Sequence, residues 1–315
     1  MARLRIRFSK LGKLRWTSHR DIARMWERAL RRAQIPVEYS HGFTPRPRIS
    51  FGLALPTGSE SVAEYLDIEI DPSATGDAMG DPWDPASRVD EALPVGVKVL
   101  AAVWSKAGDP SLQEAVCSCT WKIGLSGLEH TELEDLLGKA MASSHLVVIR
   151  ERKARQVQDD IRPALISAVG VGGRISGIDD IRPALISAVG GDLRDASRGD
   201  LGAADATSVW LGSSCAVSGG DPRGSGQPLG DGVGSIGAAV PKSGPWPVTV
   251  EIATRPRGAR PAELAQALAG LSGGACVVRA EWSVRTAQWI GGGASAREPI
   301  ALAAAPALRA LERAS

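Results

Sequence analysis

The residues best suited to chemistry in this sequence are arginines that recur at helical spacing near its start. They are Arg20, Arg24, Arg28, Arg31 and Arg32. Residues three and four apart share one face of an α-helix, so these side chains line one side of an expected helix. The planar guanidinium group donates two parallel hydrogen bonds to phosphate or carboxylate. The pattern predicts a surface for a polyanion such as a nucleic-acid backbone, or for an acidic protein. The alternative is an ordinary solvated helix face.

Segments on both sides of this helix add cations and an aromatic ring. Three cations precede it, and the segment 39–52 that follows combines Gly42, two prolines and two further arginines. A stiff loop of this kind, with Phe43 as a stacking ring, suits a nucleic-acid base and its phosphates; a well-packed turn is the alternative. The side chains predicted to contact a nucleic acid or partner are Lys10, Lys13, Arg15, Arg20, Arg24, Arg28, Arg31, Phe43, Arg46 and Arg48.

His19 and His41 are the candidates for acid–base catalysis in this basic region. Two imidazoles near a basic groove would suit metal-free RNA cleavage by a general acid and a general base. The alternative is that both cap helices or donate ordinary hydrogen bonds. No carboxylate or nucleophile is fixed beside either of them by spacing, so we expect a binding protein rather than an enzyme.

The motifs of cofactor enzymes are missing from the sequence. Cys117 and Cys119 share one face of an expected strand, but no Cys or His pair follows them at zinc spacing. The Cys-x3-Cys-x2-Cys pattern of an iron–sulfur radical enzyme is absent. So are the Gly-x4-Gly-Lys-Ser/Thr phosphate loop and a strand-linked Gly-x-Gly-x-x-Gly. We therefore expect neither a metal site nor a cofactor.

Charge is distributed unevenly along the 315 residues, although the net charge is only +2. The first fifty residues hold thirteen Lys and Arg against three acids, whereas charges in 51–114 are mostly acidic. Such asymmetry favours a polyanionic partner or a docking surface. No signal-peptide pattern, apolar run of membrane length or disulfide framework is found. We therefore expect a cytoplasmic protein that does not contact a membrane.

The elements that must position these residues alternate between strands and a helix. Basic and apolar residues alternate over 3–8, which predicts a half-buried strand. Thr17 or Ser18 is the expected N-cap of a helix that runs to about Gln34, before Pro36. Strands are expected next at 37–40, 49–53 and 63–70, then a short helix at 88–93 and a strand at 95–104. We interpret these elements as the β-α-β-β-α-β order of a ferredoxin-like unit, with one strand more than that order requires between the two helices.

The same order of elements recurs downstream. Expected there are a strand at 115–125, a helix at 131–142 and a strand at 146–152, then a strand at 248–254, a helix at 261–271 and a strand at 276–284. The predicted fold class is α+β, with two tandem ferredoxin-like units and a long disordered Gly-rich insert in the second. The expected boundaries are 1–110 for an N-terminal basic domain, 111–158 and 245–290 for the halves of the second domain, 159–244 for the insert and 291–315 for a tail.

The insert contains a perfect repeat, because Asp159–Gly170 is identical to Asp179–Gly190. Two copies of twelve residues are too few for a solenoid, so a recent tandem duplication is the favoured explanation. The rest is rich in Gly, Ser, Asp and Ala and cannot bury enough apolar surface to offset the entropy of ordering.

Several motifs are shared with a known family. They are Phe8-Ser9-Lys10, Gly12, Leu14-Arg15, Ser18-His19, Asp21, Arg28-Ala29, Arg31-Arg32-Ala33, Tyr39-Ser40, Gly42-Phe43, Pro45-Arg46-Pro47, Ser50-Phe51, Leu55-Pro56, Gly58, Glu64-Tyr65 and Asp67. With them the sequence resembles the radical-SAM-linked protein family, a bacterial domain of unknown function. The similarity is dense over 2–70, weaker to Arg162, and weaker again over 249–289. The duplicated segment and the Gly-rich insert depart from the family pattern.

The resemblance implies a partner rather than an activity. Members are encoded beside, or fused to, a radical S-adenosylmethionine (radical SAM) protein, often near genes of the ribonuclease E/G type. The leading hypothesis is an accessory protein that binds RNA or presents a substrate to a radical SAM enzyme. Two others stay open, a metal-free endoribonuclease that uses His19 or His41 and a protein-docking subunit that binds no nucleic acid.

Overall fold

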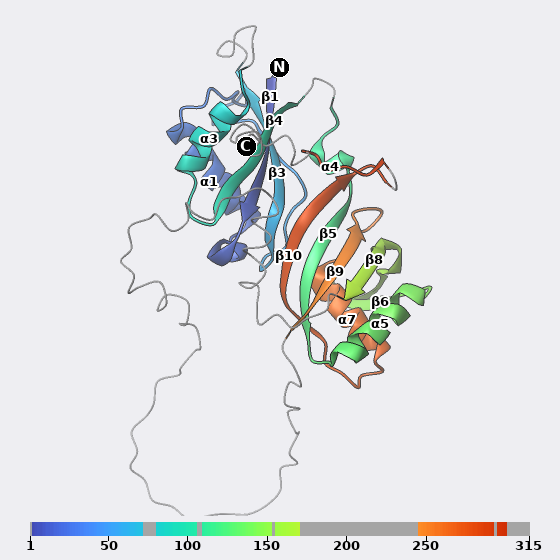
Figure 1. Cartoon of the computed structure of the whole chain (residues 1–315). Helices are drawn as coiled ribbons and strands as arrows, with labels where there is room; N and C mark the ends of the chain where they lie inside the picture. Colours follow the sequence, from blue (N-terminus) through green and yellow to red (C-terminus); the bar gives the residue numbers. More distant parts are fainter. Residues whose placement is uncertain are drawn as a thin grey trace, which may run out of the picture. The chain divides into compact units, whose positions relative to one another are not determined.

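The computed structural model describes residues 2–71, 80–105, 109–152, 155–170, 245–292 and 295–300 (Figure 1). Within these ranges the chain is a mixed α+β protein. Its main sheet has eight strands in the order β4-β1-β3-β10-β5-β9-β8, with β2 paired to β3, and a separate two-stranded sheet joins β6 to β7. No helix in the described ranges is long and apolar enough to cross a membrane.

The first half of the main sheet is built by residues 2–105. Its elements are β1 (Ala2–Lys10), the 3-10 turn η1 (Gly12–Trp16), α1 (His19–Arg32), β2 (Ile49–Phe51), β3 (Glu60–Ile70), α3 (Trp83–Ala92) and β4 (Val97–Ser105). β1 lies antiparallel between β3 and β4, and β2 pairs antiparallel with β3. Helices α1 and α3 lie side by side against these strands (Figure 1), burying Trp26, Leu30 and Val89 with Ile6 in one core. The order β-α-β-β-α-β is present in this half as β1-α1-β2-β3-α3-β4, without the additional strand expected at 37–40.

Local sequence explains both ends of α1. Ser18 is the N-cap, and its Oγ accepts a hydrogen bond of 3.2 Å from the backbone N–H of Asp21, as predicted. The expected end near Gln34 is wrong by two residues, because the backbone of Gln34 turns left-handed with φ of 51°. Ile35 N–H then donates to Leu30 O and Gln34 N–H to Arg31 O, the hydrogen bonds of a Schellman motif.

The strand expected at 37–40 is not formed as a continuous ladder. Only isolated bridges occur there, from Val37 to Ile70 and from Tyr39 to Pro47. The pairing ends on both sides of the Tyr39–Pro47 bridge because the next donors bond elsewhere: Glu38 N–H donates to Glu69 O, and Arg46 N–H donates to Ser40 Oγ. The segment instead leads into a closed loop that precedes β2.

The second half is built by residues 111–170 and 245–292. Its elements are α4 (Leu112–Ala115), β5 (Val116–Ser126), α5 (His130–Ala142), β6 (Val147–Arg152), β7 (Arg155–Asp160), the turn η2 (Arg162–Ala164), β8 (Leu165–Gly170), β9 (Trp246–Ala253), α7 (Pro261–Leu271) and β10 (Arg279–Ile290). β5 lies antiparallel between β10 and β9, and β9 pairs with β8. Helices α5 and α7 pack on each other and bury Leu133, Leu137 and Leu268 in a second core.

Two elements of this half differ from expectation. β6, expected as a strand of the second unit, pairs with β7 and with no other strand in the described ranges, so it forms a hairpin outside the main sheet. The strand that pairs with β9 is β8, which lies in the first repeat copy, Asp159–Gly170, within the expected insert. The second copy, with the rest of 171–244, and residues 301–315 of the expected tail lie outside the described residues.

Side chains join the two halves where β3 meets β10. The backbone ladder there is parallel and short, with only Val284 opposite Glu60 and Arg285 opposite Ser61. Buried hydrogen bonds reinforce it. Arg285 donates to Glu64 at 2.7 Å, and Gln288 Nε2 donates to the carbonyl of Ala63 at 2.6 Å. The halves therefore share one continuous sheet.

Candidate nucleic-acid interface

The outer face of α1 carries the predicted arginines in solvent. This group, the α1 face, consists of Arg20, Arg24, Arg28 and Arg31, all of which are exposed. Arg24 lies 3.5 Å from the Asp21 carboxylate, also on the helix. The other three have no ion pair with any residue in the described ranges. The opposite face of α1 is buried in the core, so the charged face has a fixed orientation.

The three cations that precede α1 differ in their surroundings. Lys13, on η1, is exposed. Arg15 is half-buried, and its guanidinium lies 3.6 Å from the Glu60 carboxylate. Lys10 is only 4% exposed, donates from Nζ to the carbonyl of Thr17 at 3.0 Å, and has a pKa lowered by burial. Of these predicted contacts, Lys13 alone is placed as a free surface cation.

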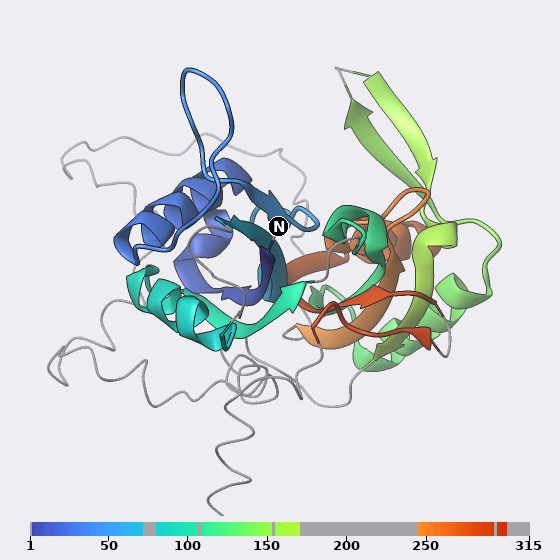
Figure 2. The same ribbon diagram turned by 90° about the horizontal axis from the view of Figure 1, so that it is seen from above.

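A loop between α1 and β2, residues 39–48, projects from the first half (Figure 2). Its base is closed by a hydrogen bond of 2.8 Å from Ser40 N–H to Arg46 O, and Ser40 Oγ accepts one of 3.1 Å from Arg46 N–H. Gly42 has φ of 138°, a value that side chains disfavour, which explains the glycine at the tip. The solvent-exposed area of Phe43 is 110% of the reference value for a fully exposed phenylalanine. Its ring therefore packs against nothing in the described part of the chain.

The two arginines of this loop are not equivalent. Arg48 pairs with Glu38 at 3.3 Å and Glu69 at 3.1 Å, so its charge is largely balanced by the protein. Arg46 is exposed and has no ion pair in the described ranges. The loop therefore presents Phe43 and Arg46 together, with Arg48 as a structural residue at its base.

The candidate histidines are not brought together. His19 is the first residue of α1, and its ring contacts Phe51 edge-on at 5.0 Å between centroids. His41 is exposed in the 39–48 loop. In the described ranges no hydrogen bond links either ring to a carboxylate or hydroxyl. Nor do three or more His, Cys, Asp and Glu side chains gather there as a metal ion would require.

A cleft of about 670 Å³ was not anticipated from the sequence. One wall consists of Trp16 and residues 54–59, and the other of residues 260–262 at the start of α7 and residues 280–283 of β10. The wall residues are far apart in sequence and meet only because β3 and β10 are neighbours. The signals available in the sequence were Trp16 next to Arg15, and an Arg-Pro pair at 260–261 before an expected helix.

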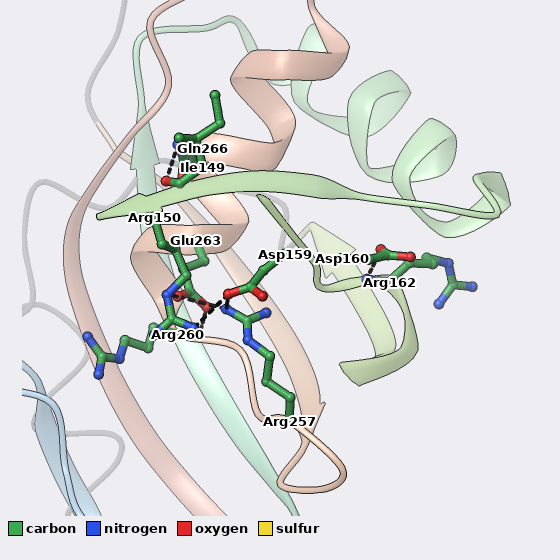
Figure 3. Close-up of polar contacts among 9 residues, drawn as sticks. All are labelled: Ile149, Arg150, Asp159, Asp160, Arg162, Arg257, Arg260, Glu263 and Gln266. Carbon is green, nitrogen blue, oxygen red and sulfur yellow. Dashed lines mark hydrogen bonds and ion pairs between the residues drawn. The ribbon is translucent and has the colours of Figure 1, made fainter. Parts of the chain in front are cut away.

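A charged network fixes the α7 side of this cleft (Figure 3). The buried carboxylate of Glu263 accepts from the backbone N–H of Arg260 at 3.0 Å and lies 3.1 Å from Arg150 and 3.2 Å from Arg257. Asp159 bridges the same two arginines at 3.0 and 3.2 Å. The network ties the β6–β7 hairpin to the start of α7 and so holds the backbone of Arg260 in place.

The first repeat copy contains a tightly bonded turn. Asp160 Oδ1 accepts from the backbone N–H groups of Leu146 and Arg162, and its Oδ2 lies 2.8 Å from Nδ1 of His145. The Leu146 bond first, then the His145 contact and the Arg162 bond, lower the pKa of Asp160 to about 2. The Arg162 guanidinium donates to the carbonyls of Met141, Ser143 and Leu165 at 2.8–2.9 Å. The Asp-Ile-Arg-Pro sequence is therefore explained by structure, without a ligand.

A comparison with models of protein families identifies the family of this chain. Residues 3–188, more than half of its length, match the family described as "uncharacterized protein conserved in bacteria (DUF2344)". The chain belongs to the DUF2344 family. The DUF2344 match includes the α1 face, the 39–48 loop and the first repeat copy, and ends within the second copy. A search of curated proteins found no match. The description of DUF2344 names no substrate, so the predicted contact residues and a radical SAM partner stay proposals.

Proposed function

We propose that this DUF2344 protein binds RNA through the α1 face and the tip of the 39–48 loop. The observation that carries the proposal is the contrast among the N-terminal arginines. Arg15 and Arg48 are balanced by carboxylates of the protein, whereas Arg20, Arg28 and Arg31 are exposed on one helix face without such partners in the described ranges. Leaving three cations unpaired on one face favours an external polyanion.

The size and chemistry of this surface favour a nucleic-acid strand over a single anion. From Arg20 to Arg31 the helix advances about 16 Å at 1.5 Å per residue. Neighbouring phosphates on one strand of B-DNA are separated by about 3.4 Å along the axis, so several successive phosphates fit this length. The exposed Phe43 ring beside Arg46 can stack an unpaired base, and unpaired bases are typical of the RNA that proteins recognise by sequence.

The accessory role follows from the resemblance to radical-SAM-linked proteins. We propose that the chain holds RNA for a radical SAM enzyme rather than reacting with it. The separate surroundings of His19 and His41 support binding over cleavage. The repeated strand order also supports two tandem ferredoxin-like units. When only the strands of the main sheet are counted, the first strand of each half lies between the third and the fourth, and the second pairs with the third (β1 to β4, then β5, β8, β9 and β10).

Filter binding to a single-stranded RNA tests the proposal. Counterion release contributes about 0.7 log unit per phosphate contact at 0.1 M salt, so loss of three contacts weakens binding by about 100-fold. We expect this effect from the triple substitution of Arg20, Arg28 and Arg31 by Ala. The matched control replaces Arg155, Arg279 and Arg297, which are exposed elsewhere and also lack ion pairs in the described ranges.

The control triple variant should bind within about twofold of the parent, since it removes the same charge from other surfaces. Equal losses in both variants would mean that net charge alone attracts RNA, and would overturn the proposed site. Absence of RNA binding, together with capture of the radical SAM protein after ribonuclease treatment, would instead assign the α1 face to an acidic protein.

A further inference from the structure

The cleft between Trp16 and the start of α7 has an aromatic wall that is rigidly held. Gly58 has φ of 89°, and a Cβ there would lie 3.0 Å from Cζ3 of Trp16, so glycine lets the indole rest on the loop. Gly58 N–H also donates to Arg15 O at 2.8 Å. The Arg15 guanidinium lies 5.3 Å from the indole centroid. Even so, Trp16 remains 63% exposed. A fixed, exposed indole is a platform for a planar ligand.

The opposite wall provides a cation. Arg260 is exposed and has no ion pair in the described ranges, although its backbone N–H is held by Glu263. In Figure 3 its side chain extends away from Glu263 and Asp159. The carboxylates that balance Arg150 and Arg257 therefore leave Arg260 available to an anion in the cleft.

The remaining wall offers acceptors and donors. Glu281 is the extra residue of a β-bulge, because the register of β10 against β5 shifts between Ala280 and Trp282. Its carboxylate accepts from Ser126 Oγ at 2.5 Å, which fixes its position. Ser59 and Ser283 bond each other at 2.8 Å, and one hydroxyl hydrogen of this pair remains to be donated.

We propose that this cleft binds one nucleotide of the RNA strand. Its base stacks on Trp16, its phosphate is held by Arg260, and Glu281 accepts from an amino group on the base edge, as carboxylates do with cytosine. The volume of about 670 Å³ lies within the range of about 300–1,000 Å³ typical of small-ligand sites. The assignment rests on the proposed RNA binding and names a second contact that is separate from the α1 face.

Calorimetric titration of the full chain with 5′-GMP tests this site directly. We expect saturable binding that Trp16→Ala weakens by about 5- to 150-fold, the range given by base–aromatic stacking. Trp16→Phe, which keeps an aromatic ring, should restore most of the affinity. Arg260→Ala should weaken 5′-GMP about tenfold without affecting guanosine, which lacks the phosphate. Arg155→Ala is the matched control, an exposed arginine outside the cleft, and should bind as the parent does.

Base selectivity tests the role of Glu281. 5′-UMP, whose base has no amino group, should bind more weakly than 5′-GMP, and Glu281→Ala should reduce this difference. The proposal is overturned if the parent does not bind 5′-GMP at millimolar concentration, or if Trp16→Ala and Arg260→Ala leave binding unchanged. In the parent, RNA binding without 5′-GMP binding removes only the nucleotide site, whereas 5′-GMP binding without RNA binding removes the α1 assignment. The triple α1 variant should lose RNA binding and still bind 5′-GMP, because the cleft is separate from the α1 face.

Discussion

The buried ion pair between Glu64 and Arg285 should be a main determinant of how firmly the two halves are joined. The Arg285 side chain is 2% exposed and that of Glu64 is 10% exposed. Arg285 donates to Glu64 Oε1 from Nη2 at 2.7 Å and from Nε at 3.1 Å. Glu64→Gln removes the negative charge and leaves the guanidinium uncompensated. Breaking one partner of a buried pair costs about 3–5 kcal/mol, so we expect the free energy of unfolding to fall by that amount.

Urea denaturation at neutral pH measures this effect. Arg285→Met should also destabilise the protein, but the double variant should lose much less than the sum of the single losses, because neither charge is then left unpaired. The control is Asp135→Asn, which breaks the exposed pair with Lys139, an interaction worth only about 0.3–0.5 kcal/mol on a helix. A loss below about 1 kcal/mol for Glu64→Gln, or additive single losses, would refute the assigned role of the pair.

Three further predictions concern packing and the turn of the first repeat copy. A Cβ on Gly124 would lie 2.3 Å from the Trp282 indole, so Gly124→Ala should lower the free energy of unfolding in urea by about 1–3 kcal/mol. The control Gly138→Ala, which has open space on helix α5, should raise it by about 0.5–1 kcal/mol. Equal effects of the two substitutions would contradict the packing of Gly124 against Trp282. Arg162→Ala leaves three backbone carbonyls without their hydrogen-bond donor and should lower the free energy of unfolding by about 1–3 kcal/mol. An unchanged free energy of unfolding would contradict this, because it would show that water donates to these carbonyls equally well. The pKa of Asp160 is lowered from 3.8 to about 2 in the folded protein. The stabilisation that its ionised carboxylate gives the folded state is therefore complete above about pH 4 and is lost as the pH falls towards 2. The urea midpoint should fall over that interval less steeply in Asp160→Asn, and identical profiles would exclude the linkage.

Local signals were sufficient for the basic helix. Ser18 and Asp21 set the start of α1, and the spacing of its arginines placed them on the solvent face, because both depend on neighbours within one or two turns. The end of the helix was misplaced because nothing in the sequence marks Gln34 as left-handed. Strand β8 was missed for a different reason: two identical copies of its sequence exist, and composition cannot tell which copy pairs with β9.

The features that could not be predicted from the sequence depend on contacts between residues far apart in it. Lys10 was expected at the surface, but its side chain is buried and donates a hydrogen bond to the carbonyl of Thr17. The charge of Arg48 is partly balanced by the carboxylate of Glu69 on strand β3. The cleft combines Trp16 with Arg260, which are brought together by the short parallel contact of β3 and β10. Periodicity and spacing do not report which strands become neighbours across such a distance in sequence.

The salt dependence of RNA binding tests the assignment of the α1 face most directly. For single strands, the slope of log K against log salt concentration changes by about 0.7 for each phosphate contact. The account predicts that the triple substitution of Arg20, Arg28 and Arg31 reduces the magnitude of this slope by about 2, while the control triple substitution leaves it unchanged. An unchanged slope in the α1 variant would contradict it, because three phosphate contacts cannot be lost without releasing fewer counterions.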